Sequence, residues 1–301
     1  MSNIWRGVIP AITTPFHEDL SIDHGFFADH CRWLIESGCT GIVALGSLGE
    51  GATLSLEEKR ALLMTAVKAV GSRAPVMAGI SALSTEEAVV IARMAQDAGC
   101  QGLMVLPPYV YIGDWRETKT HVSAILAATP VSAMLYNNPV AYTTDFLPWQ
   151  VAELLAEHSN LHAIKESSAD VRRVAALRAA AGERLQILCG VDDLIVEAAG
   201  MGASGWIAGL VNAFPSESVE LFRLASAGEK EKAWELYRWF LPLLRMDTVP
   251  KFVQLIKLAQ QEVGMGNERV RAPRLTLVGS EWDEALATIR MALGTRGAAR
   301  V

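Results

Sequence analysis

The sequence predicts an α/β protein, a (β/α)8 TIM barrel with a C-terminal helical extension. Two observations predict it: eight short apolar runs alternate with longer amphipathic stretches, and only helical patterns follow the eighth run. The runs are 7–13, 40–45, 75–80, 102–106, 131–137, 161–165, 185–190 and 204–209. Each is nearly all apolar, which is typical of parallel strands that are covered on both faces. Their spacing, about 20–35 residues, is that of successive strand–helix units.

Serine caps and glycine stops mark the helices between these runs. Residues 55–70 and 84–99 each begin with a serine that is followed three positions later by a glutamate, the pattern of a capping box. Residues 170–182 are amphipathic and end at a glycine, which is common just after a helix. An open, doubly wound sheet is the competing fold, but it usually has fewer strands, and its GxGxxG turn is missing after the first run.

Three further helical patterns, 229–245, 250–264 and 280–293, follow the eighth run without a long linker. Their wide apolar faces indicate that they pack against other elements. We therefore expect a barrel with the active site over residues 1–225 and C-terminal helices packed on it over 226–301.

Composition excludes several classes of protein. The 301 residues are 51% hydrophobic and 20% charged, with a net charge of −6 and no basic stripe, so nucleic acid is not an expected partner. The N-terminus lacks the pattern of a signal peptide, and no apolar run reaches the roughly 18 residues of a membrane helix. The four cysteines lie far apart, as reduced thiols do. We expect a cytoplasmic protein without a membrane partner.

Chemically useful residues follow several of the predicted strands. GSLGE (46–50) follows the second, YNNP (136–139) ends the fifth, Lys165 ends the sixth, and CGVDD (189–193) ends the seventh. Catalytic groups of such barrels come from the C-terminal ends of the strands. One lysine and several hydroxyl groups should therefore point into one mouth.

Lys165 is unusual because it ends an apolar run. It has three interpretations: a lysine whose ammonium reaches solvent, half of a buried ion pair with Glu166 or Asp170, or a nucleophile. A neutral amine attacks a ketone or imine carbon to form a Schiff base, and burial lowers the pKa as this requires. Tyr136 and Ser47 would supply a proton relay, and the amides of GSLGE would hold a carboxylate.

Each of these features also has a plainer interpretation. Tyr136 is consistent with a core residue, GSLGE with a simple turn, and Asp192 with a helix cap. Their occurrence together at one end of one predicted barrel favours an active site over these separate explanations.

The segments GSLGE, YNNP and IKES, in this order and at these strand ends, resemble the dihydrodipicolinate synthase / N-acetylneuraminate lyase family over essentially the whole chain. The resemblance implies a homotetramer or homodimer that forms Schiff bases with 2-oxo acids and needs no metal or organic cofactor. It implies that Lys165 is the Schiff-base lysine, Tyr136 the catalytic tyrosine and Ser47 the first hydroxyl residue of the loop. The backbone of Ser47 and Leu48 would cradle the substrate carboxylate, and Gly49 of the same loop is expected to contact the substrate.

Three positions depart from the family pattern. The second hydroxyl position of the loop is Leu48, and Ala141 stands where dihydrodipicolinate synthases have an arginine that grips a second carboxylate. Val110 falls where they have a tyrosine that reaches the neighbouring subunit, with Tyr109 and Tyr111 on either side. These departures argue against dihydrodipicolinate synthase itself.

The longer segments YNNPVAYTTD, CGVDDLIVEAAGMGASGWIAG and YRWFLPLLRMDT most resemble the hydroxyproline-degradation branch, the 1-pyrroline-4-hydroxy-2-carboxylate deaminases. These enzymes form 2-oxoglutarate semialdehyde and ammonia. By this resemblance Lys165 adds to the ring C=N carbon, and the 4-hydroxyl leaves with help from Tyr136 and Ser47. Further substrate contacts are expected from Tyr109, Tyr142, Gly190 and Trp206.

Three alternatives stay open. A 2-keto-3-deoxy sugar acid aldolase or dehydratase, or another pyruvate-dependent aldolase, would keep the lysine but change the reaction. A barrel that binds a small acid without catalysis would need no nucleophile. A metal-dependent hydrolase is disfavoured: only His158 and His162 have helical ligand spacing, and they lie at the start of the sixth strand, away from the predicted active end.

Overall fold

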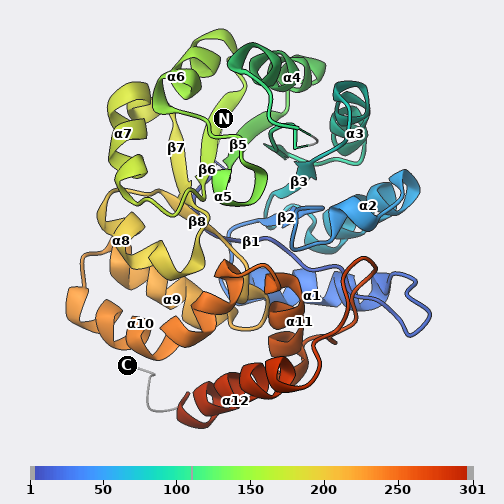
Figure 1. Ribbon diagram of the computed structural model, residues 1–301, viewed down its shortest axis with the longest axis vertical. Helices are drawn as coiled ribbons and strands as arrows, with labels where there is room; N and C mark the ends of the chain where they lie inside the picture. The colour runs from blue at the N-terminus through green and yellow to red at the C-terminus, as the bar shows by residue number, and fades with distance from the viewer. Residues whose placement is uncertain (1–3, 110, 297–301) are drawn as a thin grey trace.

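A computed structural model describes residues 4–109 and 111–296. Eight parallel strands form a nearly closed barrel, surrounded by helices (Figure 1). The strands are β1 (Gly7–Pro10), β2 (Ile42–Ala44), β3 (Val76–Ile80), β4 (Gly102–Val105), β5 (Ser132–Asn137), β6 (Leu161–Glu166), β7 (Gln186–Cys189) and β8 (Gly205–Ala208). Each lies within or overlaps one of the eight predicted apolar runs. The predicted fold is therefore confirmed.

The strands follow one another around the barrel. Their order is β1-β8-β7-β6-β5-β4-β3-β2, and each neighbouring pair in this order is parallel. Between β1 and β2 the closure is a single parallel bridge from Ala11 to Val43, supported by a 2.9 Å bond from the Ile12 amide to the Val43 carbonyl. All eight C-terminal ends consequently meet at one mouth.

The barrel helices begin where the capping residues are. The helices are α1 (His24–Glu36), α2 (Leu56–Val70), α3 (Thr85–Asp97), α4 (Trp115–Ala128), α5 (Pro139–Tyr142), α6 (Pro148–Glu157), α7 (Arg172–Ala181), α8 (Ile195–Gly200) and α9 (Pro215–Ser226). Ser55 and Glu58 form the predicted capping box of α2, and Ser84 accepts from the Glu87 amide at the start of α3. Short 3-10 turns also occur in the described part of the chain: η1 (Gly51–Thr53), η2 (Gly182–Arg184), η3 (Asp192–Leu194), η4 (Leu210–Asn212) and η5 (Arg245–Thr248).

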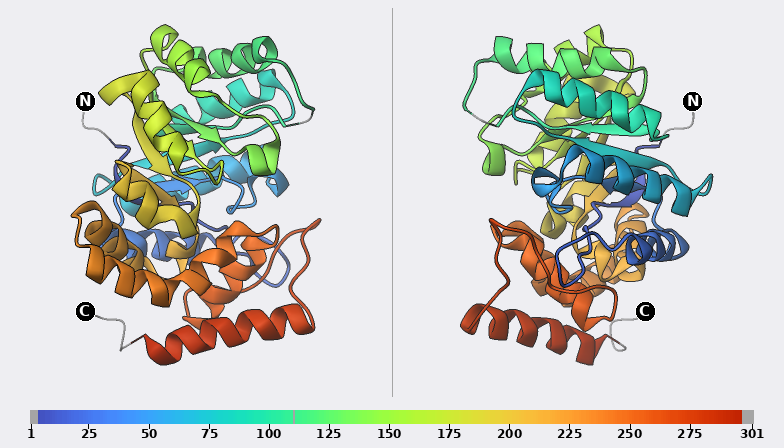
Figure 2. Two further views of the ribbon diagram at one scale, coloured as in Figure 1. Left: turned by 60° about the vertical axis from the view of Figure 1, so that its left-hand side comes forward. Right: turned by 90° about the vertical axis from the view of Figure 1, so that its right-hand side faces the viewer.

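Three C-terminal helices lie together along one side of the barrel (Figures 1 and 2). They are α10 (Lys230–Leu244), α11 (Phe252–Glu262) and α12 (Ser280–Thr295), where the sequence predicts them. α10 packs on α9, and the expected division between residues 225 and 226 falls one residue before the end of α9. The turn η5 and the start of α11 reach the barrel mouth. Among the described residues, no helix combines the length and apolarity that crossing a membrane requires.

Candidate active site

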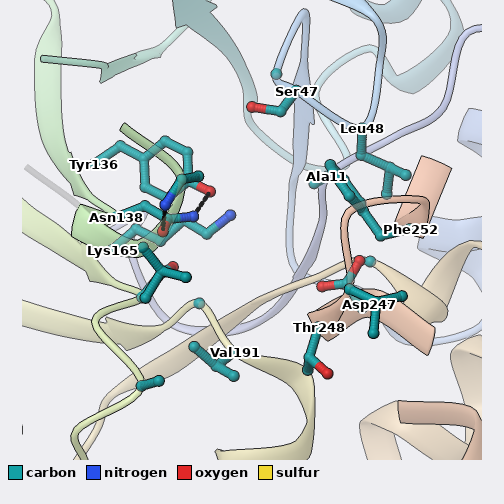
Figure 3. A pocket seen from close by; sticks show the side chains of 18 of the residues that line it. Ala11, Ser47, Leu48, Tyr136, Asn138, Lys165, Val191, Asp247, Thr248 and Phe252 are labelled. Carbon is teal, nitrogen blue, oxygen red and sulfur yellow. Dashed lines mark hydrogen bonds between the residues drawn. The ribbon is translucent and has the colours of Figure 1, made fainter. Parts of the chain in front are cut away.

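A cavity of about 390 Å³ opens at the C-terminal ends of the strands (Figure 3). Its walls include Ser47 after β2, Tyr136 on β5, Lys165 on β6, Gly190 after β7, and Asp247 on η5. The strands thus bring together the lysine, tyrosine and serine that lie far apart in the sequence. The turn η5 and the start of α11 complete the wall.

The register of β5 and β6 places the two central side chains. Tyr136 is the register partner of Lys165 on the neighbouring parallel strand, so both side chains point to the same face. The Lys165 Nζ lies 4.2 Å from the centre of the Tyr136 ring. The ammonium or amine therefore rests against an aromatic face at the cavity wall.

Lys165 is buried without an ion-pair partner among the described residues. Only 7% of it is exposed, and burial lowers the pKa of its ammonium, an effect that the neighbouring acidic groups, Asp247 and Asp192 among them, oppose. The proposed ion pairs with Glu166 or Asp170 are wrong. Glu166 accepts from Asn137 Nδ2 and from the Ser168 amide, and Asp170 pairs with Arg172.

Gly190 makes room for this lysine. A Cβ atom at this position would lie 2.6 Å from Lys165 Cε and 2.0 Å from the hydroxyl oxygen of Ser167. Any side chain there would displace the lysine or the serine. The glycine after β7 therefore sets the path that the Lys165 side chain takes into the cavity.

The Tyr136 hydroxyl is held at the cavity by its own strand end. It accepts a 3.0 Å hydrogen bond from Asn138 Nδ2, and the Asn138 side chain also accepts from the Ala141 amide at the start of α5 (Figure 3). Burial raises the pKa of Tyr136 to about 12. The phenol is therefore protonated at neutral pH and can donate or relay a proton.

A second tyrosine of the same chain joins Ser47 to this group. The Ser47 hydroxyl bonds to the Tyr142 hydroxyl, and the Tyr142 ring meets the Tyr136 ring edge-on at 5.7 Å. Burial raises the pKa of Tyr142 to about 12. Tyr109 packs beside Tyr142, with ring centres 6.1 Å apart. Three hydroxyl groups from one chain, on Ser47, Tyr142 and Tyr136, thus gather beside Lys165.

The loop after β2 offers free amides to the cavity. Within the described residues, no carbonyl or side chain accepts a hydrogen bond from the amides of Ser47 and Leu48. The loop is tight: a Cβ on Gly49 would lie 2.8 Å from the Ile12 carbonyl oxygen. Adjacent unpaired amides form a site for an anion such as a carboxylate.

The sequence did not predict that two carboxylates, Asp192 and Asp247, lie near Lys165. Asp192 is fully buried and accepts from Trp206 Nε1 at 2.9 Å and from the amides of Gly209 and Leu210, so its assignment as a helix cap is wrong. Asp247 lines the cavity. It lies within the quoted segment YRWFLPLLRMDT, but nothing in its spacing signals that this residue reaches the barrel mouth.

Some expected substrate contacts reach the cavity wall and others do not. Ser47, Leu48, Tyr136, Lys165 and Gly190 line it. The cavity lining does not include Gly49, Tyr109, Tyr142 or Trp206, and Trp206 is fully buried, with its indole N–H donating to Asp192.

Ala141 lines the cavity. The cavity wall therefore carries an uncharged side chain at the position where dihydrodipicolinate synthases have an arginine. Val110 lies outside the described residues. At the other end of the barrel, His158 and His162 each bond a serine hydroxyl, on Ser123 and Ser132 respectively.

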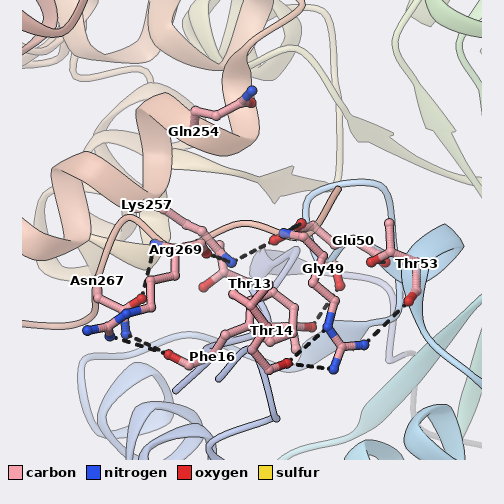
Figure 4. Close-up of polar contacts among 12 residues, drawn as sticks. Thr13, Thr14, Phe16, Gly49, Glu50, Thr53, Gln254, Lys257, Asn267 and Arg269 are labelled. Carbon is pink, nitrogen blue, oxygen red and sulfur yellow. Dashed lines mark hydrogen bonds and ion pairs between the residues drawn. The ribbon is translucent and has the colours of Figure 1, made fainter. Parts of the chain in front are cut away.

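A second buried lysine lies behind the GSLGE loop (Figure 4). Lys257 on α11 donates to Glu50 at 2.6 Å and to the Arg269 carbonyl at 2.6 Å. The other oxygen of Glu50 accepts from the Arg271 amide at 2.9 Å. This buried pair anchors the last residue of the loop to the C-terminal helices.

Comparisons with known proteins agree over nearly the whole chain. Residues 4–292 match the profile of the Dihydrodipicolinate synthetase family. The chain is 30% identical to a 4-hydroxy-tetrahydrodipicolinate synthase of Agrobacterium fabrum, covering 94% of this chain and 96% of the relative. The structure of the 4-hydroxy-tetrahydrodipicolinate synthase from Methylacidiphilum fumariolicum has a TM-score of 0.91 at 28% identity, covering 98% and 99%. YagE of E. coli, a prophage protein of the same family in complex with pyruvate, has a TM-score of 0.90 at 26% identity, covering 97% and 99%.

Proposed function

The chain belongs to the dihydrodipicolinate synthetase family, and from this premise we propose that it is a 1-pyrroline-4-hydroxy-2-carboxylate deaminase. Membership makes it an enzyme of a class I Schiff-base lyase family, whose members bind small 2-oxo acids such as pyruvate. The substrate and the reaction are the parts that we propose.

One observation carries the choice of substrate: Lys165 is the single basic side chain among the described residues that line the cavity. The free amides of the GSLGE loop can hold one carboxylate, and Ala141 offers no charge for a second. A substrate with one carboxylate and an electrophilic C=N carbon matches a cavity that has one lysine and one set of free amides. The cyclic imino acid named above has both.

The reaction begins with addition of the neutral Lys165 amine to C2 of the ring. The C2–N bond of the ring then breaks, leaving the substrate as an iminium on Lys165 with a free amino group at C5. Loss of a C3 proton gives an enamine, and the enamine electrons expel the 4-hydroxyl as water. Because the lysine nitrogen accepts and returns the electron pair, no metal is needed for these steps.

Release of the product consumes two water molecules. A proton shift from C5 converts the C5 amine into an imine, and one water hydrolyses it and releases ammonia. A second water hydrolyses the Lys165 Schiff base and releases 2-oxoglutarate semialdehyde. The contact of the Tyr136 ring with the lysine nitrogen and the bonded Ser47–Tyr142 hydroxyl pair support a role for these groups in moving protons at that nitrogen.

An aldolase remains the second candidate, because YagE holds pyruvate and the same lysine would capture it. The two reactions differ in their products. The test is to incubate the protein with pyrroline hydroxycarboxylate, with keto-deoxy sugar acids, and with pyruvate plus aldehydes. We expect ammonia from the first and little turnover of the others.

Borohydride reduction during turnover tests the covalent step. We expect a substrate adduct on Lys165 by mass spectrometry, lost in Lys165→Ala and kept in Lys251→Ala, which removes an exposed lysine. Pyruvate release without ammonia would favour the aldolase. Ligand binding that survives Lys165→Ala, with no turnover of any substrate, would indicate a non-catalytic binding protein.

A further inference from the structure

Asp247 faces Lys165 across the cavity from outside the barrel proper (Figure 3). It belongs to η5, between α10 and α11, and not to a strand end. Among the described residues, none donates a hydrogen bond to its carboxyl group. Its oxygens are therefore available to whatever occupies the cavity.

The fold reserves space for this carboxyl group. A Cβ on Gly209 would lie 2.0 Å from Asp247 Oδ1 and 2.6 Å from Cγ, so only a glycine at this position leaves room for the carboxyl group beside the end of β8. The packing resembles that of Gly190 against Lys165 on the neighbouring strand end. Two glycines thus make room for the two ionisable side chains that face each other.

Asp192 and Asp247 are unequal neighbours. Asp192 accepts N–H bonds from Trp206, Gly209 and Leu210, which favour its ionised form, although burial raises its pKa to about 6. Asp247 has no such donors; burial and the charge of Asp192 raise its pKa well above the ordinary value, although the charge of Lys165 opposes them. When two carboxyl groups share a site, the one without donors holds the proton.

We propose that Asp247 is a catalytic residue, the general acid that protonates the departing 4-hydroxyl of the Lys165 adduct; this inference rests on the proposed deaminase function. Position separates it from the other acids of the site. The Tyr136 ring lies 4.2 Å from the Lys165 Nζ, the atom that bonds to C2 in the adduct, whereas the leaving group is on C4, two bonds further from the lysine. Asp247 is on the opposite wall.

Elimination of the 4-hydroxyl moves one electron pair and one proton. The enamine electron pair forms the new C3=C4 double bond, and the C4–O bond breaks. The departing oxygen takes the proton of the Asp247 carboxylic acid and leaves as water. Asp247 becomes a carboxylate facing the new iminium cation on Lys165, and opposite charges in a buried cavity stabilise each other. In this proposal, Asp247 supplies the proton that the family resemblance gives to Tyr136 and Ser47.

The test compares two leaving groups in Asp247→Asn. The natural substrate needs a proton on its hydroxyl, whereas the 4-fluoro analogue, 4-fluoro-1-pyrroline-2-carboxylate, loses fluoride without one. We expect kcat for ammonia release from the hydroxy substrate to fall about 10²- to 10⁴-fold, with fluoride release from the analogue close to wild type. The matched control is Asp193→Asn, the same change at a nearby carboxylate that pairs with Arg245 at 3.8 Å.

Each outcome decides the inference. Equal losses on both substrates would show that Asp247 only maintains the site, and unchanged rates on both would show that it does not act; either result overturns the inference while the deaminase function stands. If the wild-type protein releases neither ammonia nor fluoride, but borohydride traps pyruvate on Lys165, the proposed function fails and the inference fails with it. Slow hydroxyl loss in Asp193→Asn would also contradict a specific role.

Discussion

Lys165 and Lys257 are both buried lysines, and their surroundings differ in the hydrogen-bond acceptors and the open space around the nitrogen. Each lies against an aromatic ring, Tyr136 at 4.2 Å and Phe16 at 4.4 Å respectively. Lys257 also donates to the Glu50 carboxylate and to a backbone carbonyl, both at 2.6 Å. Lys165 has no acceptor of this kind among the described residues and faces a cavity instead.

The comparison shows that burial alone does not make a lysine a nucleophile. Burial lowers the pKa of both, that of Lys257 to about 8, but Glu50 opposes the effect and keeps the Lys257 nitrogen engaged. An amine attacks carbon through a free lone pair, which requires both a lowered pKa and room for the carbon. Lys165 meets both conditions, whereas Lys257 is part of the structure that holds the GSLGE loop.

The largest expected effect comes from replacing each of the two lysines by methionine in a separate variant. Lys257→Met leaves the fully buried Glu50 without its cation, so we expect a loss of about 3–5 kcal/mol in the free energy of unfolding. Lys165→Met removes an unpaired buried amine, so we expect unchanged or higher stability and no covalent adduct. Chemical denaturation and borohydride trapping measure the two effects.

A rescue variant checks the cause of the first effect. Lys257→Met combined with Glu50→Gln should recover part of the lost stability, because the amide carries no unpaired charge. A Lys257→Met protein as stable as wild type, or a Lys165→Met protein that loses several kcal/mol, would mean that the two lysines do not divide their roles in this way.

A smaller effect is expected from Gly190→Ala, which shifts Lys165 without removing it. The new methyl group would meet Lys165 Cε at 2.6 Å, and a misplacement of about 1 Å can cost on the order of 10²-fold in rate. We therefore expect adduct formation to slow by about that factor, measured by quenching with borohydride at intervals. Gly200→Ala is the control, because a Cβ there has no atom within 4 Å. Equal rates in the two variants would exclude a positioning role for Gly190.

The smallest expected effect is on pH dependence. Because the pKa of Lys165 is lowered, the unfolded chain binds more protons than the folded protein between the two pKa values. The Lys165 contribution to stability therefore rises with pH across that window, and the rate of adduct formation should rise with it. The rate should level off below the value of about 10.4 that is ordinary for lysine. A Lys165→Met protein with the same stability–pH curve as wild type would contradict this reasoning.

Much of the fold could be predicted because its signals are local. An apolar run and a serine followed by a glutamate three residues later depend on neighbouring residues only, and β3, β6 and α2 formed where these patterns lie. Lys165 and Tyr136 could be placed at one mouth because barrel topology sends every strand end to the same side.

The carboxylates of the site could not be predicted in this way. Asp247 reaches the cavity only because α10 and α11 pack against the barrel and aim the turn between them at the mouth. The Asp192 side chain takes its donors from residues 14 to 18 positions away, on and after β8, and no periodicity marks those contacts. The Ser47–Tyr142 contact spans 95 positions of sequence.

The sequence by itself determined the barrel, the strand on which Lys165 stands and the family to which the chain is similar. Only the tertiary structure decided which lysine is free and which is paired, and which carboxyl group has donors and which faces the cavity. The physical reason is that strand and helix formation follow from hydrophobic periodicity and capping, which depend on residues close together in the sequence. Burial, pairing and shared protons depend on the distance between side chains that the chain brings together only when it folds.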